Sequence, residues 1–235
     1  MNRLTLVVST RNRLDKLKRM LDSIEYDNID FPFLIIIVCD ADKATYGAML
    51  KDERVGVSKL VDSKTPKGSV FCRNVGTQLA IDGVSWGVDD VVYEPGFFNR
   101  AFVKYNSNFP ESDGILAFNV LNNKTRVRKR KQSRCGLGMV GKVWLDRYPE
   151  RKLFCPEYNH FSVQEIALLG MKLNKLILAE DLKVYHLSPA AGELVDRTHI
   201  EARKYRQEDK QVSGRRHKEG KIWGWKNEMA RGRLE

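Results

Sequence analysis

The chain has 235 residues, a formal net charge of +11 and a 42% share of hydrophobic residues. Such a length can bury a sizeable core, and it fits one domain followed by a C-terminal appendage. The longest apolar stretch, residues 31–39, is too short to cross a bilayer, and no signal-peptide pattern precedes the first strand-like run. The four cysteines lack a CxxC pair, which argues against a disulfide framework and a structural zinc site. We therefore expect a soluble protein with reduced thiols in the cytoplasm.

The hydrophobic pattern predicts strands that alternate with helices. Residues 4–9 form a short apolar run rich in β-branched side chains, residues 14–24 carry apolar side chains at helical spacing, and residues 33–38 form a continuous apolar strand. The remaining expected elements, in chain order, are helix 69–81, strand 84–92, strands 114–120 and 140–144, helix 163–173 and strand 183–186. This alternation predicts a doubly wound α/β sheet, which binds ligands at the carboxyl ends of its strands.

The excess positive charge is concentrated in two segments. Residues 124–134 hold seven Lys or Arg and no acid, whereas residues 196–235 hold twelve basic and seven acidic residues. Such runs are typical either of solvated, mobile loops or of sites for polyanions such as nucleic acid and anionic lipid, and the sequence leaves both interpretations open.

Short motifs at residues 8–13, 40, 73–74 and 88–95 resemble, in the same order along the chain, those of family 2 glycosyltransferases with the GT-A fold. The segment 8–13 resembles the first strand and loop of that family, which receive the nucleoside of the donor. Asp40 ends the second predicted strand, where the family contacts the base, and the pair Arg73 and Asn74 resembles one that faces the uridine side of the donor. The donor-binding residues that this resemblance implies are Thr10, Arg11, Asp40, Arg73, Asn74 and Asp89.

The segment 88–95 resembles the three-aspartate metal motif of that family and the proline turn that follows it, although Val88 replaces the first aspartate. The resemblance implies that Asp90 holds Mn²⁺ or Mg²⁺ and that Asp89 faces ribose or sugar. Carboxylates suit such hard cations, which offset the charge that develops on a leaving nucleotide diphosphate. His186 resembles a family histidine that reaches the metal or diphosphate from the opposite wall. Taken alone, the acidic pair is explained as well by a solvated turn, and the histidine by a half-buried hydrogen-bonded ring.

An inverting transfer also needs a carboxylate that takes the proton from the acceptor hydroxyl. The segment 155–165 resembles the acceptor-side stretch of the family, but Gln164 stands where an aspartate is common. We predict Glu165 as the base and Glu157 as the reserve candidate. A glutamate near a helix start is explained equally well by the positive end of the helix dipole.

The basic run lies where the resembling family has its acceptor loops, and stretches such as residues 191–235 also resemble small glycosyltransferases of tailed bacteriophages. The favoured acceptor is therefore a hydroxymethylated base in phage DNA. A protein, a lipid-linked saccharide and a cell-surface glycan are the alternative acceptors. The predicted acceptor-binding residues are Arg126, Arg128, Lys129, Arg130 and Lys131.

Together these features predict a GT-A domain in residues 1–190, with a mostly parallel mixed sheet, and a basic, partly helical extension in residues 191–235. The predicted function is a metal-dependent, inverting transfer of a sugar from a UDP-sugar donor. The rival hypothesis is a catalytically silent GT-A module that binds nucleic acid, which Val88 and Gln164 favour. The retained donor and metal residues argue against it, because a silent module has no physical reason to keep them together.

Overall fold

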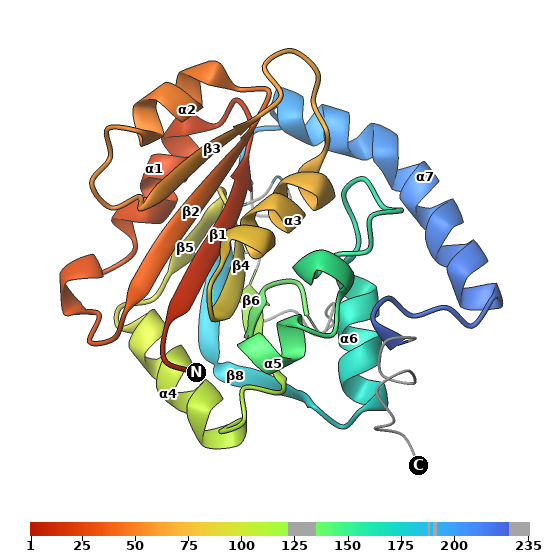
Figure 1. Cartoon of the computed structure of the whole chain (residues 1–235). Coiled ribbons are helices and arrows are strands. Elements are labelled where there is room, and N and C mark those ends of the chain that lie inside the picture. Colours follow the sequence, from red (N-terminus) through yellow and green to blue (C-terminus); the bar gives the residue numbers. More distant parts are fainter. Residues whose placement is uncertain (122–134, 188, 190–191, 226–235) are drawn as a thin grey trace.

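The computed structural model describes residues 1–121, 135–187, 189 and 192–225. Its centre is an eight-stranded mixed sheet with the strand order β3-β2-β1-β4-β7-β6-β8-β5, and helices surround it (Figure 1). The predicted α/β class is therefore confirmed. Within the described part of the chain, no helix is both long and apolar enough to cross a membrane.

The N-terminal half of the sheet is parallel. Its strands are β1 (Leu4–Thr10), β2 (Phe33–Asp40), β3 (Val57–Val61) and β4 (Gly83–Val88). β1 lies in the middle and pairs in parallel with both β2 and β4, so the carboxyl ends of these strands meet at one edge. Continuous apolar runs predicted β1 and β2, because strands covered on both faces need no polar side, whereas the more polar β3 was not predicted.

The C-terminal half mixes directions. Its strands are β5 (Val91–Tyr93), β6 (Ile115–Leu121), β7 (Gly138–Val140) and β8 (Leu176–His186). β7 runs antiparallel between β4 and β6, and β5 pairs antiparallel with the end of β8. Three strand predictions need correction here. The predicted short strand 183–186 is only the end of β8, which begins at Leu176. The segment 84–92 is two strands separated by a turn, and the segment 140–144 is only the last residue of β7 followed by a helical turn.

The longer helices are α1 (Leu14–Asp22), α2 (Lys43–Met49), α3 (Ser69–Leu79), α4 (Phe97–Asn108), α6 (Val163–Lys172) and α7 (Arg197–Lys218). The helical turn α5 (Lys142–Leu145) and the two 3-10 turns, Tyr26–Asn28 and Pro149–Arg151, complete the described elements. Helix α3 packs on β1 and β2. Its first turn therefore starts near the edge where the parallel strands end.

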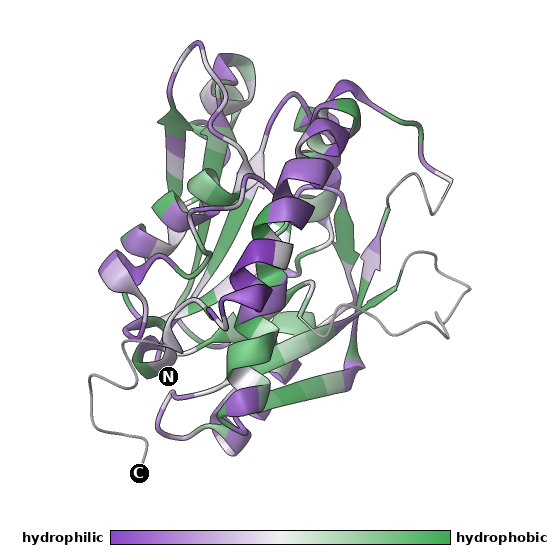
Figure 2. Cartoon of the chain, turned by 90° about the vertical axis from the view of Figure 1, so that its right-hand side faces the viewer, coloured by the Kyte–Doolittle hydropathy of each residue, from purple (hydrophilic) through white to green (hydrophobic). Residues whose placement is uncertain are grey.

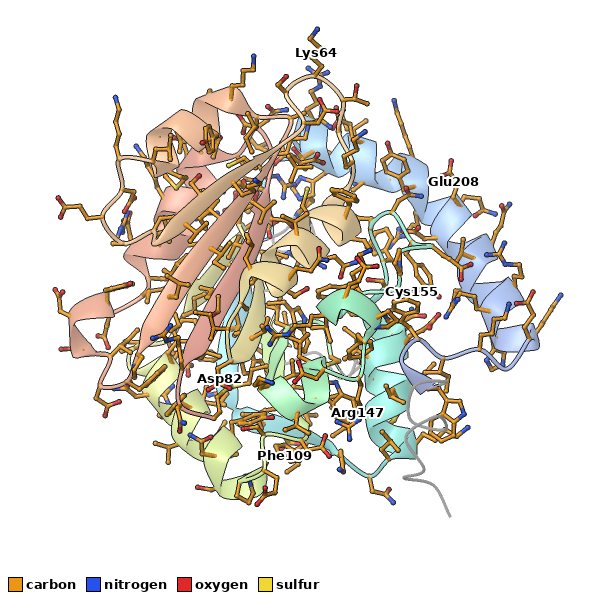
Figure 3. All side chains as sticks on the ribbon, viewed as in Figure 1. Lys64, Asp82, Phe109, Arg147, Cys155 and Glu208 are labelled. Atoms are coloured by element: carbon orange, nitrogen blue, oxygen red, sulfur yellow. The ribbon has the colours of Figure 1, made fainter. Side chains whose placement is uncertain are left out.

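A continuous apolar core lies along the sheet, with Trp86 and Trp144 among its largest fully buried side chains. Not every buried charge belongs to the edge of the sheet: Arg147, labelled in Figure 3, is 1% exposed and pairs with Asp113. This ion pair lies among α5, β6 and α6, where it joins secondary-structure elements of the C-terminal half.

Helix α7 differs from the other helices because it lies on the outside of the domain and is largely hydrophilic (Figure 2). Its only buried residues are two charged ones, Asp209 and Arg216. A helix that is polar all round is held by charges and hydrogen bonds more than by an apolar stripe. The contacts of α7 therefore matter for the site described next.

Candidate donor and metal site

The acidic pair predicted from the sequence lies in the turn between β4 and β5. Asp89 and Asp90 are each only 3% exposed. At the end of the neighbouring strand β1, the Thr10 hydroxyl donates a hydrogen bond of 2.8 Å to Oδ2 of Asp89. The structure therefore brings together polar side chains from the carboxyl ends of two adjacent parallel strands.

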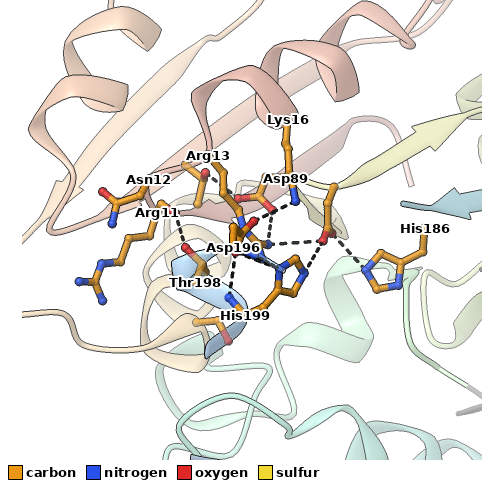
Figure 4. Close-up of polar contacts among 12 residues, drawn as sticks. Arg11, Asn12, Arg13, Lys16, Asp89, His186, Asp196, Thr198 and His199 are labelled. Carbon is orange, nitrogen blue, oxygen red and sulfur yellow. Dashed lines mark hydrogen bonds and ion pairs between the residues drawn. The ribbon is translucent and has the colours of Figure 1, made fainter. Parts of the chain in front are cut away.

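The guanidinium of Arg13 bridges this pair and the start of α7. Its Nη1 lies 3.1 Å from Oδ1 of Asp89 and 3.4 Å from Oδ2 of Asp90. The same group binds Asp196, the N-cap of α7, with Nη2 3.0 Å from Oδ1 and Nε 3.0 Å from Oδ2 (Figure 4). A cation thus offsets the repulsion between adjacent buried carboxylates. Lys16 adds a second positive charge, with Nζ 2.8 Å from Oδ2 of Asp196.

Two histidines approach Asp90. His186 directs Nε2 to Oδ1 at 3.1 Å, because the antiparallel pairing of β5 with β8 places it opposite Val91. His199, in the first turn of α7, has Nε2 3.6 Å from Oδ2, and its Nδ1 lies 2.9 Å from Oδ1 of Asp196. The structure thus places two histidines beside the acidic pair, the predicted site residue His186 and also His199.

The pKa values of the two carboxylates are shifted in opposite directions. Burial, and then the charge of Asp90, raise the pKa of Asp89 to about 6. Burial also acts on Asp90, but hydrogen bonds from His186 and His199 outweigh it and hold the pKa of Asp90 far below its usual range. Asp90 is therefore a permanently ionised carboxylate at neutral pH, which is the form that binds a cation.

The described residues contain no group of three or more His, Cys, Asp or Glu side chains arranged as a complete metal site. A divalent cation that binds with a nucleotide does not need one, since phosphate oxygens and waters fill most of its coordination positions. One or two protein ligands suffice, and the ionised carboxylate of Asp90 with the imidazole of His186 fits that requirement.

A third cationic group lies nearby in α3. Arg73 is 7% exposed, its Nε has no hydrogen-bond partner, and its guanidinium stands 5.5 Å from the ring centre of Phe154. Burial lowers its pKa to about 10, so it stays charged at neutral pH. A buried guanidinium with unused donors suits an anionic or carbonyl-bearing ligand. The amide of Asn74 instead bonds the backbone of Phe154 on both sides, at 2.8 and 2.9 Å.

Asp40 shapes the loop in front of α3. Its carboxylate accepts hydrogen bonds from the backbone N–H groups of Lys67 at 2.8 Å and Gly68 at 3.0 Å. Gly68 has a φ of 89°, and a Cβ atom there would stand 2.8 Å from the carbonyl oxygen of Asn159. Glycine is thus needed both for the backbone angle and for the close approach of the segment 157–162.

The two candidate bases lie away from the acidic pair. Glu165 accepts hydrogen bonds from Nε and Nη2 of Arg216 at 2.6 and 2.8 Å, from the Tyr158 hydroxyl at 2.8 Å and from the backbone N–H of Trp223 at 2.6 Å. Its side chain is 6% exposed, whereas that of Glu157, which pairs with Arg216 as well, is 43% exposed. Among the described residues, no hydrogen bond or ion pair joins either glutamate to the acidic pair.

Helix α7 connects the two regions. Near its start, the Thr198 hydroxyl donates to the carbonyl of Arg11 at 2.8 Å, and Glu201 pairs with the Arg11 side chain at 2.7 Å. In its second half, Asp209 accepts three backbone N–H bonds of 2.8 to 2.9 Å from residues 159–161. The helix therefore runs from the acidic pair past the segment 157–162 to Glu165.

The sequence did not single out Arg13, Asp196 or His199 as site residues. Arg13 lies in the segment that resembles the nucleoside loop, but nothing in the sequence shows that α7 folds back onto it. The predicted acceptor-binding residues between 126 and 131 lie outside the described residues.

The sequence matches no protein-family model and no curated protein. Solved structures resemble its fold. TarS 1–349 of S. aureus in complex with UDP has a TM-score of 0.58 and 15% identity, over 80% of this chain and 61% of that one. The mannosyltransferase PcManGT of Pyrobaculum calidifontis, in complex with GDP-Man and Mn²⁺, has a TM-score of 0.58 and 16% identity, over 78% of this chain and 56% of that one.

The chain has the GT-A fold. TarS 1–349 in complex with UDP-GlcNAc gives a similar result, with a TM-score of 0.57, 14% identity and coverage of 85% of this chain and 64% of that one. The chain thus spans less than two thirds of the length of each of these glycosyltransferases. Identities this low establish the fold, and the function has to be argued from the site.

Proposed function

We propose that this chain is a metal-dependent glycosyltransferase that moves a sugar from a UDP-sugar to a hydroxyl acceptor with inversion. The observation that carries the proposal is the buried carboxylate of Asp90, 3.1 Å from Nε2 of His186, at the carboxyl edge of a GT-A sheet. Structures with this fold hold UDP-GlcNAc in one case and GDP-Man with Mn²⁺ in another, which supports a nucleotide sugar and a divalent cation here.

In this proposal Asp90 and His186 hold the divalent cation, which stabilises the negative charge of the leaving diphosphate when bound. Arg13 and Arg73 add positive charge around the same carboxylates and favour a dianionic ligand electrostatically. The remaining proposed donor-binding residues are Thr10, Arg11, Asp40, Asn74 and Asp89. Among these, Asp40 and Asn74 act by shaping the backbone around α3, since their polar atoms already bond it.

Binding of a matching donor should stabilise the protein measurably. A ligand present at 100 times its dissociation constant adds about 2.7 kcal/mol to the free energy of unfolding. We expect this stabilisation in thermal unfolding with one UDP-sugar and Mn²⁺, and a much smaller one with the same sugar and a chelator. If no nucleotide sugar shifts the transition in the presence of Mn²⁺, the donor proposal is wrong.

The base is proposed to be one of the two glutamates predicted from the sequence. The carboxylate of Glu165 already accepts four hydrogen bonds, so it must release Arg216 or another donor before it can take a proton. Glu157 is much more exposed. Glu157 pairs with Arg215 and Arg216 as well, but water can replace these partners at an exposed carboxylate. The difference in exposure therefore favours Glu157 over Glu165.

We expect Glu157→Gln to lower the rate of sugar transfer about 100-fold or more and to leave donor affinity within a factor of about two. A base acts on the acceptor proton and does not hold the nucleotide. Transfer rates and donor titrations on this variant and on Glu165→Gln would check this. Loss of transfer in a folded Glu165→Gln protein, with none in Glu157→Gln, would return the base to Glu165.

For the acceptor we propose a hydroxymethylated base in DNA, as in modified phage DNA. The support is positive charge, both in the acceptor-binding residues between 126 and 131 and on the outer side of α7. Incubating the protein with a radiolabelled UDP-sugar and DNA that contains hydroxymethylated bases tests the proposal directly. Label that reaches a protein, lipid-linked saccharide or cell-surface glycan instead of DNA would replace this acceptor.

A further inference from the structure

The acidic side chains and the exposed basic side chains of α7 differ in their contacts. Its acids contact the domain: Glu201 pairs with Arg11, the exposed Glu208 lies 3.4 Å from the Asn159 amide, and Asp209 holds the backbone of residues 159–161. Apart from Arg197, which pairs with Glu201, its exposed cations form no ion pair with these acids within the described residues, so the helix keeps a positive charge on its exposed surface.

Three of these cations line one side of α7. Arg203, Arg206 and Lys210 are exposed and follow His199 at steps of four, three and four residues, which places all of them on one helical face. Within the described part of the chain, the ion pairs of α7 use other cations, Arg197 and Arg215 among the exposed ones. We call Arg203, Arg206 and Lys210 the basic row of α7.

The row begins beside the candidate metal site. His199, on the same face, has its Nε2 3.6 Å from Asp90, and the guanidinium of Arg206 stands 5.8 Å from the ring centre of Phe161. Phe161 is 40% exposed and belongs to the segment 157–162, which begins with Glu157. From position 203 to position 210 the helix rises about 10 Å, the length over which one strand of a B-form helix carries about three phosphates.

We propose that the basic row binds consecutive phosphates of a single nucleic-acid strand and leads that strand toward the acidic pair. Exposed, unpaired cations at regular spacing suit a linear phosphodiester backbone, and Phe161 offers an exposed ring on which a base can stack. The inference rests on the proposed function, since it assigns the acceptor strand of that reaction to a particular surface.

The test compares two triple variants that remove the same charge. One replaces Arg203, Arg206 and Lys210 by alanine. The control replaces Lys204 and Lys218, which lie on α7 but off the row, and Lys51, just after α2; all three are exposed. Binding of a fluorescent single-stranded oligonucleotide is measured by anisotropy between 50 and 200 mM salt, on the full chain.

For single strands the slope of log affinity against log salt is about −0.7 per neutralised phosphate, so loss of the row should flatten the slope by about two. The control should change it by less than half of that. Equal changes in both variants, or no change in the row variant, would overturn the proposal. So would equally tight binding of polyglutamate that depends on the same three residues, because that outcome identifies an acidic protein as the partner.

Donor binding is measured in the same proteins to separate the two proposals. UDP titrations with Mn²⁺ should give equal affinities in the wild type, the row variant and the control. If UDP binds none of them but the row variant still loses the salt dependence, the donor proposal fails and the basic row stands. If UDP binds all three and the oligonucleotide results are equal, the basic row fails alone.

Discussion

Replacing Asp90 with alanine should lower the rate of sugar transfer about 100- to 1,000-fold, the usual cost of losing one electrostatic stabiliser in an active site. Asp90 is the one member of the acidic pair whose pKa is held far below its usual range, so it supplies the negative charge for a cation. Mn²⁺ affinity, measured by electron paramagnetic resonance in the presence of UDP, should fall with the rate.

The fold should survive this change. Arg13 keeps its contacts with Asp89 and Asp196, and Asp90 itself lies in a turn outside the apolar core. The exposed residue Asp27 provides a control, since Asp27→Ala removes a carboxylate far along the chain from the turn. A folded Asp90→Ala protein with wild-type turnover in Mn²⁺ would show that the diphosphate binds elsewhere.

Replacing Arg216 with alanine should lower the free energy of unfolding by about 3 to 5 kcal/mol. Arg216 and Glu165 form a bidentate pair in which both side chains are 6% exposed. Removing the guanidinium leaves a buried carboxylate with only the Tyr158 hydroxyl and the Trp223 N–H as partners. Urea unfolding followed by circular dichroism measures the loss.

The neighbouring residue offers a matched control. Arg215 also pairs with Glu157, but its side chain is 55% exposed, and exposed ion pairs contribute about 0 to 1 kcal/mol. Arg215→Ala should therefore have a small effect. Equal losses in the two variants would mean that burial of the Arg216 pair does not determine the stability of this region.

The sequence allowed β1, β2 and β4 of the parallel half of the sheet to be predicted because their signals are local, whereas β3, with its mixed polar and apolar residues, was missed. Apolar runs such as Phe33–Asp40 identify strands without reference to any partner. The segment 84–92 was harder, since apolar residues lie on both sides of the acidic pair and only the pairing of β5 with β8 turns it into two strands. That pairing joins residues about 90 positions apart, which a local pattern does not reveal.

Some contacts of the candidate site could likewise be predicted from the sequence, and others could not. Thr10 and the acidic pair could be brought together from strand order alone, because parallel strands share one edge. His199 joins them only because α7 returns to the N-terminal loop, and the contact between Arg13 and Asp196 that holds this return joins residues 183 positions apart. The ion pair between Glu165 and Arg216 is likewise a contact between residues far apart in the sequence.

The anchoring of α7 has a consequence for anyone who shortens this protein. The apolar core is formed mainly by the sheet and its neighbouring helices. A cartoon of the fold therefore suggests that the C-terminal part of the chain can be removed. Yet Glu165 obtains its counter-charge from Arg216, and residues 159–161 obtain a hydrogen-bond acceptor from Asp209. A trimmed version would need a compensating apolar residue at position 165 and a redesigned segment around position 160, so the extension and the domain have to be engineered together.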